Sequence, residues 1–168
     1  MSVRNAIFSD IPEVVRLMRE AHERSIYADI ATFDEVEAQQ LCMRTINRHG
    51  HPNYGGTLFL LSVDGGHVLG FLIGFMDKVY PCLKELMATD LAFYFSDQAE
   101  PRDAAIMVGK LGEWAIASPK CIELHLGVTA AVGDWERIGK LYEHLGLERC
   151  GGMWRRTINR PRQEAANE

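Results

Sequence analysis

Long apolar runs, closely spaced cysteines and an excess of positive charge are all missing from this sequence of 168 residues. The longest apolar stretch, "VLGFLIGFM" at residues 68–76, is too short to span a bilayer. The opening "MSVRNAIFSD" has no apolar run of signal-peptide length, so we expect a cytoplasmic protein with no membrane partner. Cys42, Cys82, Cys121 and Cys150 lack the close spacing of a zinc site, which favours reduced thiols and no bound metal.

The charge balance is acidic, with a formal net charge of −5. This argues against nonspecific binding to nucleic acid as the main task, although a local basic patch is compatible with it. Hydrophobic residues make up 47% and charged residues 24%, which is typical of a soluble globular protein. The length suffices for one domain with a real core. We expect that domain over residues 1–158 and a polar tail, "NRPRQEAANE", over 159–168.

The first half of the chain predicts a strand, two helices and a hairpin. "SVRNAI" at residues 2–7 is typical of a strand, and Asp10 can cap the helix that follows. Thr32 and Glu35 have capping-box spacing before a second helix, which we expect to end near Gly50. "GTLFLLSV" and "HVLGFLIGFM" predict two strands joined by a tight turn at "DGG", residues 64–66.

The second half predicts strand, helix, strand, helix and a final strand. "LMATDLAFYF" at 86–95 and "CIELHL" at 121–126 are the strands on either side of a helix that begins near Pro101 and ends at Ser118. A last helix begins near Asp134 and ends at Gly146, and "MWRRTI" at 153–158 predicts a closing strand. The sheet should be mixed, with a right-handed parallel step between residues 86 and 126.

This element order, together with two local motifs, resembles the GCN5-related N-acetyltransferase (GNAT) family. "VRNAIFSDIPEVVRLMREA" is similar to the opening strand and helix of the family, and "ERIGKLYEHLGLERCGGMWRR" to its closing segment, where L-Y-E-x-L-G is a recurring motif. Within that segment, Glu136, Arg137 and Gly139 resemble small members found in phage and prophage genes. The resemblance implies an α/β (α+β) fold, GNAT-like, with a central mixed twisted sheet of about six to seven strands flanked by about four helices.

The resemblance also implies a reaction, in which acetyl-CoA is the cosubstrate and donates its acetyl group to a primary amine. The amine must lose a proton and the departing thiolate must gain one. Tyr142 matches the family tyrosine that protonates the thiolate, but it also lies on the apolar stripe of its helix, where a core tyrosine would lie. Asp90, in "TDLAFYF", matches the acidic base of histone-type members, and a structural aspartate is the equal alternative. His125 is the reserve base.

For the cosubstrate, the same alignment implicates the backbone of Phe93, Tyr94 and Phe95. The Tyr94 N–H takes the position that polarises the thioester carbonyl, and the three residues together would pair with the pantetheine arm as with an added strand.

The loop that follows, residues 96–102, contains no glycine. The family loop for the CoA phosphates reads Gln/Arg-x-x-Gly-x-Gly/Ala, and this sequence has "AEPRDA" at 99–104, in which only Ala104 fits. A helix N-terminus still favours an anion, but Glu100 and Asp103 oppose one and Pro101 removes a donor. Arg102 either pairs a phosphate or obstructs the site. We interpret the loop as a weakened or remodelled cosubstrate site; if it carries a gap, Gln98 takes the first position.

Two functions are compatible with these features. The first is an acetyl-CoA-dependent N-acetyltransferase whose acceptor is a small-molecule or protein amine. The second is a catalytically silent GNAT-fold protein that binds a partner, for example in a phage particle. Glu20, Glu23 and Asp29 lie where this fold builds its acceptor pocket, and acidic residues there suit a cationic amine, although solvated helix faces look the same. The family often forms homodimers, and nothing in the sequence specifies one.

Overall fold

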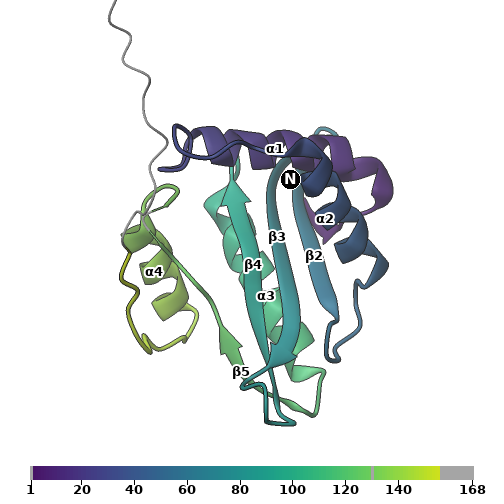
Figure 1. The fold of residues 1–168 in the computed structure, drawn as a ribbon, viewed down its shortest axis with the longest axis vertical. Coiled ribbons are helices and arrows are strands. Elements are labelled where there is room, and N and C mark those ends of the chain that lie inside the picture. Colours follow the sequence, from purple (N-terminus) through teal and green to yellow (C-terminus); the bar gives the residue numbers. More distant parts are fainter. Residues whose placement is uncertain (1, 130, 156–168) are drawn as a thin grey trace, which may run out of the picture.

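The computed structural model describes residues 2–129 and 131–155, which form one five-stranded mixed sheet with helices on both faces (Figure 1). In sheet order the strands are β1 (Ser2–Asn5), β2 (Thr57–Asp64), β3 (His67–Lys78), β4 (Leu86–Phe95) and β5 (Cys121–His125). The helices are α1 (Ile11–Glu23), α2 (Glu35–Asn47), α3 (Pro101–Ile116) and α4 (Trp135–His144), with a short 3-10 helix at Phe8–Asp10. Only β4 and β5 pair in parallel, which confirms the predicted strand–helix–strand step. None of the helices in these ranges is long and apolar enough to cross a bilayer.

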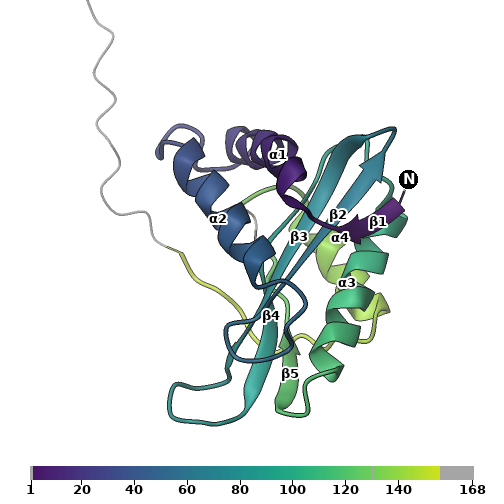
Figure 2. The same cartoon turned by 90° about the vertical axis from the view of Figure 1, so that its right-hand side faces the viewer.

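Helices α1 and α2 lie on one side of the sheet and α3 on the other (Figure 2), and a hydrophobic cluster fills the space on each face. In β2, Phe59 and Leu61 pack with α1 and α2, whereas Leu58 and Leu60 pack with α3 and α4. Because successive side chains of a strand point to opposite faces, a strand covered on both faces needs a continuous apolar run. "TLFLLSV" is such a run, and the turn after it has positive φ at Gly65 (55°) and Gly66 (89°), so the predicted hairpin is confirmed.

The strand β4 contains a bulge that the sequence pattern does not predict. Ile73 of β3 pairs with Ala92, but the next residue, Gly74, pairs with Asp90, so Leu91 has no counterpart. One extra residue reverses which face each later side chain meets. As a result Tyr94 joins the cluster under α1, and Phe93 packs on the opposite cluster.

One of the two predicted helix caps is wrong, and the other has Asp10 at the expected N-cap position of α1 but without a capping hydrogen bond. The Asp10 side chain accepts no hydrogen bond from α1; Arg4 donates to both of its oxygens at 2.7 Å, and the Ile7 N–H donates to it at 2.9 Å. A bidentate guanidinium is the stronger partner for a carboxylate. At α2 the cap is Asp34 rather than Thr32, since Asp34 accepts from the Glu37 N–H at 3.0 Å.

The predicted sheet of six to seven strands is also wrong for the described residues. "MWRRTI" does not form a strand at residues 153–155, where Met153 and Trp154 are exposed, and its last three residues lie outside the described ranges, as does the predicted tail. In β5 the expected alternation fails at Ile122, which is exposed: Leu86 pairs with Cys121 and Met87 with Glu123, so Ile122 has no counterpart in β4.

Candidate active site

A groove opens where β4 and β5 separate. The two strands pair only from Leu86 opposite Cys121 to Thr89 opposite His125. Beyond that point, a cavity of about 980 Å³ is lined by β4 residues 93–95, by the β4–α3 loop and by one side of α4. In Figure 1, α4 and the end of β4 lie on the two sides of this opening. On the side away from β3, β4 residues 91–95 have no strand partner in the described part of the chain.

Asp90 directly follows the last residue of β4 that pairs with β5, and it is not among the residues that line the cavity. Its Oδ1 accepts a hydrogen bond from the Gly127 N–H at 2.8 Å, which links β4 to the chain beyond β5 just where strand pairing ends. Burial raises the pKa of the Asp90 carboxyl above its ordinary value, although the Gly127 bond opposes the shift. A carboxylate with a raised pKa is better suited to take a proton near neutral pH than an exposed one.

Tyr142 is held beside this carboxylate by α4. The helix begins at Asp134, whose side chain accepts from the N–H groups of Glu136 and Arg137 at 3.1 Å, and it is followed by Gly146 at a φ of 86°. Tyr142 is only 7% exposed. Burial first, and the charge of Asp90 second, raise the pKa of the Tyr142 hydroxyl well above its ordinary value. The phenol therefore keeps its proton at neutral pH and can donate a hydrogen bond to a neighbouring anion.

A hydrogen-bonded network ties α1 to the end of β4. The Tyr94 hydroxyl donates to Glu20 at 2.9 Å and accepts from Arg24 at 3.2 Å, and Arg24 also forms a two-point ion pair with Asp97. Asp97 has its pKa lowered by this guanidinium. The sequence prediction gave Tyr94 only a backbone role and missed Arg24 and Asp97. The spacing of Glu20 and Arg24 on one helix was a usable signal, but nothing local connects them to Asp97.

Part of the backbone of the β4–α3 loop has no N–H free for a ligand. The Ala99 N–H donates to the Ser96 carbonyl at 3.1 Å, the Asp103 N–H donates to the Glu100 carbonyl at 3.0 Å, and Pro101 has no N–H. Two of these donors are thus already used, and the third is missing from the sequence.

Of the three residues that the sequence assigned to this end of the cosubstrate site, only Ala104 lines the groove. Asp103 is 4% exposed and its carboxylate accepts a hydrogen bond from the Ser62 hydroxyl of β2, so it is directed into the fold. Arg102 is exposed and does not line the groove. Phe93, Tyr94 and Phe95 do line it, as expected for a strand edge beside a ligand.

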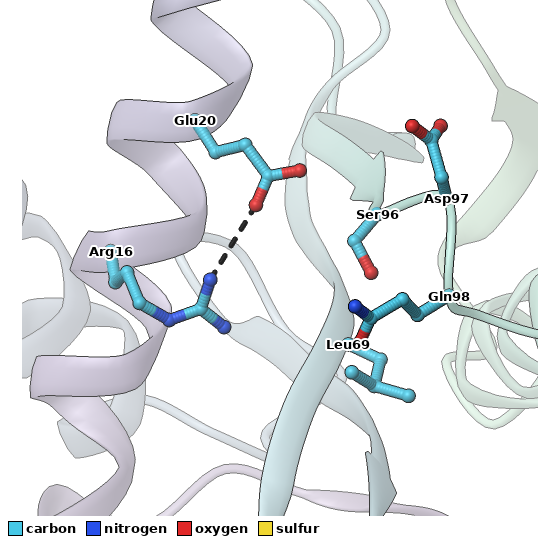
Figure 3. A pocket seen from close by; sticks show the side chains of 6 residues that line it. All are labelled: Arg16, Glu20, Leu69, Ser96, Asp97 and Gln98. Carbon is cyan, nitrogen blue, oxygen red and sulfur yellow. Dashed lines mark hydrogen bonds and ion pairs between the residues drawn. The ribbon is translucent and has the colours of Figure 1, made fainter.

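A smaller cavity of about 160 Å³ lies on the α1 side of the same loop (Figure 3). Gln98, the alternative first position of the phosphate loop, lines this cavity and not the groove. Figure 3 shows its side chain close to Ser96 and Leu69, across from Arg16 and Glu20 of α1. The guanidinium of Arg16 already has Glu20 at 3.5 Å and the Val68 carbonyl at 3.0 Å as partners. With its cation engaged, the small cavity is a poorer site for an anion than the groove.

No protein-family model matches the sequence, and no curated protein matches it either. Solved structures do share its fold. The aminoglycoside antibiotic 6'-N-acetyltransferase AAC(6')-IG of Acinetobacter haemolyticus aligns with a TM-score of 0.65 and 13% identity over 95% of this chain and 99% of its own. An acetyltransferase of Trypanosoma brucei gives 0.67 and 12% over 94% and 99%. AAC(6')-Iy, in complex with the bisubstrate analog CoA-S-monomethyl-acetylneamine, gives 0.65 and 12% over 94% and 98%. The predicted GNAT-like fold is confirmed.

Within this fold the structure brings Asp90 and Tyr142 together but not His125. The His125 ring is paired with Glu123 at 3.0 Å, and both side chains are about half exposed. In the described ranges, no group of three or more His, Cys, Asp or Glu is placed to hold a metal ion. Asp90 and Tyr142, which lie near each other where β4 and β5 separate, and the groove next to them together form the candidate active site.

Proposed function

We propose that the protein is an acetyl-CoA-dependent N-acetyltransferase that acts on a primary amine. One observation carries the proposal: a half-buried carboxylate and a buried phenol, Asp90 and Tyr142, lie near each other where β4 and β5 separate, next to a groove. An amide-bearing chain can lie along the unpaired edge of β4 as an added strand would. The volume of about 980 Å³ lies within the range of small-molecule sites.

The two groups have complementary proton chemistry. We assign to Asp90 the proton that the amine loses as its nitrogen bonds to the acetyl carbon, and the raised pKa of its carboxyl supports this role. We assign to Tyr142 a hydrogen bond, and then a proton, to the thiolate that leaves when the carbon–sulfur bond breaks, and a phenol that keeps its proton supports this role. In many active sites the local environments give two titratable groups different protonation states, so that one acts as the acid and the other as the base.

The acceptor is a primary amine, and aminoglycosides are one class to test because two of the structural neighbours are aminoglycoside acetyltransferases. The Glu20 carboxylate lines the smaller cavity on the α1 side of the loop and not the groove, and its ion pairs with Arg16 and Arg24 leave it only partly available to a cationic amine. For this reason the acceptor panel should include amines of low and high charge.

Calorimetric titration with CoA and acetyl-CoA, followed by a thiol-release assay with a panel of amines, tests the proposal. We expect binding that is weaker than in proteins with the glycine loop, and thiol release that depends on an added amine. Thiol release without amine measures hydrolysis and is the control. Absence of binding at millimolar acetyl-CoA would overturn the proposal and leave the fold as a binding module.

A further inference from the structure

The α4 wall of the groove carries a row of basic side chains. Arg137, Lys140 and His144 all line the cavity. Their spacing of three and then four residues places them on one face of α4. Ile138 and Leu141 line the cavity beside them, so the same wall offers both apolar and cationic contacts.

These cations have no carboxylate partners in residues 2–129 and 131–155, unlike the arginines of α1. Arg16, Arg19 and Arg24 each form an ion pair, whereas no ion pair involves Arg137 or Lys140. The nearby Asp134 is occupied in capping α4. Two unneutralised positive charges therefore face the groove from one helix.

The opposite wall, formed by the β4–α3 loop and Arg24, contributes no unpaired cation to the groove. The β4–α3 loop contributes the Glu100 carboxylate, and its Asp97 carboxylate is already balanced by Arg24. Its Ala99 and Asp103 N–H groups already donate to backbone carbonyls, and Pro101 has none. The two walls thus differ in what they offer an anion, and the difference favours α4.

We propose that the α4 row, and not the N-terminus of α3, binds the phosphate groups of the CoA cosubstrate. This inference rests on the proposed function. Arg137 offers a planar, five-donor group suited to a phosphate, and Lys140 a point charge one turn further along the helix. The apolar stretch between them and β4, formed by Phe93, Phe95 and Leu141, then receives the uncharged arm of the ligand.

Titration of CoA into wild type, Arg137→Gln, Lys140→Gln and the double variant, at low and high salt, tests the assignment. We expect each single substitution to weaken binding by about three- to thirtyfold at low salt, and the double variant to lose more. The differences should shrink at high salt because these contacts are exposed. Lys110→Gln, which removes the same charge from an exposed position of α3 outside the groove, is the matched control and should change affinity less than about twofold.

The loop provides the opposing test. Arg102→Gln should leave the affinity for CoA unchanged. If Arg102→Gln weakens binding while the α4 variants do not, the phosphates lie at the loop and the inference is wrong. An equal loss of CoA affinity in all variants, Lys110→Gln included, would show that only net charge matters, and this result would also overturn the inference. If wild type itself binds no CoA, both the inference and the proposed function fail. If wild type binds CoA and the α4 variants bind it equally well, only the inference fails. Thermal unfolding of each variant confirms that the fold is intact.

Discussion

The Asp90 carboxylate accepts a hydrogen bond from the Gly127 N–H at 2.8 Å, at the end of the pairing between β4 and β5. Burial raises the pKa of this carboxyl, so folding favours its neutral form, and the contribution of Asp90 to stability falls as the pH rises above its ordinary pKa. Asp90→Asn keeps an oxygen acceptor and removes the charge. We therefore expect it to be at least as stable as wild type at pH 7.

The same substitution should damage catalysis, because an amide cannot take the proton of the amine. We expect kcat to fall by about 10²- to 10⁴-fold. Urea unfolding and steady-state rates on one preparation check both effects. Asp90→Ala is the control for the hydrogen bond, since it removes the acceptor as well and should cost about 1 kcal/mol of stability. If kcat is unchanged in Asp90→Asn, Asp90 is a structural residue and not the base.

Tyr142→Phe should lower kcat and leave the affinity for acetyl-CoA almost unchanged, because protonation of a leaving thiolate matters mainly in the transition state. The expected loss is about 10²- to 10⁴-fold. Tyr94→Phe is a matched control in the same groove. Its hydroxyl is committed to Glu20 and Arg24, so its loss should cost about 1 kcal/mol of stability and leave the chemical step nearly unaffected. Equal rates for wild type and Tyr142→Phe under conditions where chemistry is limiting would make Tyr142 a core residue.

The core strands and the last helix were predictable because local patterns determine them. The run "TLFLLSV" must be a strand covered on both faces, and Asp134 must cap the helix that presents Tyr142. The bulge at Leu91 was not predictable, since nothing in "LMATDLAFYF" differs from a regular strand and the extra residue is set by pairing with β3. For the same reason the ion pair between Arg24 and Asp97, two residues far apart in the sequence, could not be found from spacing.

The orientation of Asp103, in the first turn of α3, also depends on a residue far away in the sequence. The prediction counted Asp103 among the charges that oppose a phosphate, because the sequence places it in the first turn of α3. The hydroxyl of Ser62, on a strand that precedes the loop by a long stretch of chain, draws that carboxylate inward. Which side chain of a helix turn faces a ligand depends on what the sheet offers on the other side.

Gly56→Ala should destabilise the protein strongly. A β-carbon at this position would lie 1.7 Å from the carbonyl oxygen of His51, a backbone atom that cannot move aside without disturbing the connection between α2 and β2. We expect a loss of about 2 kcal/mol or more in the free energy of unfolding, measured in urea. Gly109→Ala is the control, because no atom lies within 4 Å of its added β-carbon and alanine favours the helix by about 0.5–1 kcal/mol. Equal stabilities for the two variants would contradict the crowding at Gly56.

The stability of the α2–β2 connection should depend on pH through His49. Its Nδ1 accepts a hydrogen bond from the Phe59 N–H at 3.0 Å, which requires a ring that is unprotonated at that nitrogen. Burial first, and the charge of His51 second, lower the pKa of His49 below its ordinary value. At a pH between the two pKa values the unfolded chain binds more protons than the folded one, so stability rises with pH there. The contribution is complete above about pH 6.5, the ordinary pKa of histidine, and is lost as the pH falls below it.

His49→Asn separates this effect from the titration of other groups, because an asparagine oxygen can accept the Phe59 N–H without gaining a proton. We expect unfolding free energies measured from pH 8 to pH 5 to fall less steeply for His49→Asn than for wild type. His67→Gln, at an exposed position of the β2–β3 hairpin, should follow the wild-type curve. Parallel curves for wild type and His49→Asn would show that the Nδ1 hydrogen bond contributes nothing to the acid limb, since only a titrating acceptor produces a difference in slope.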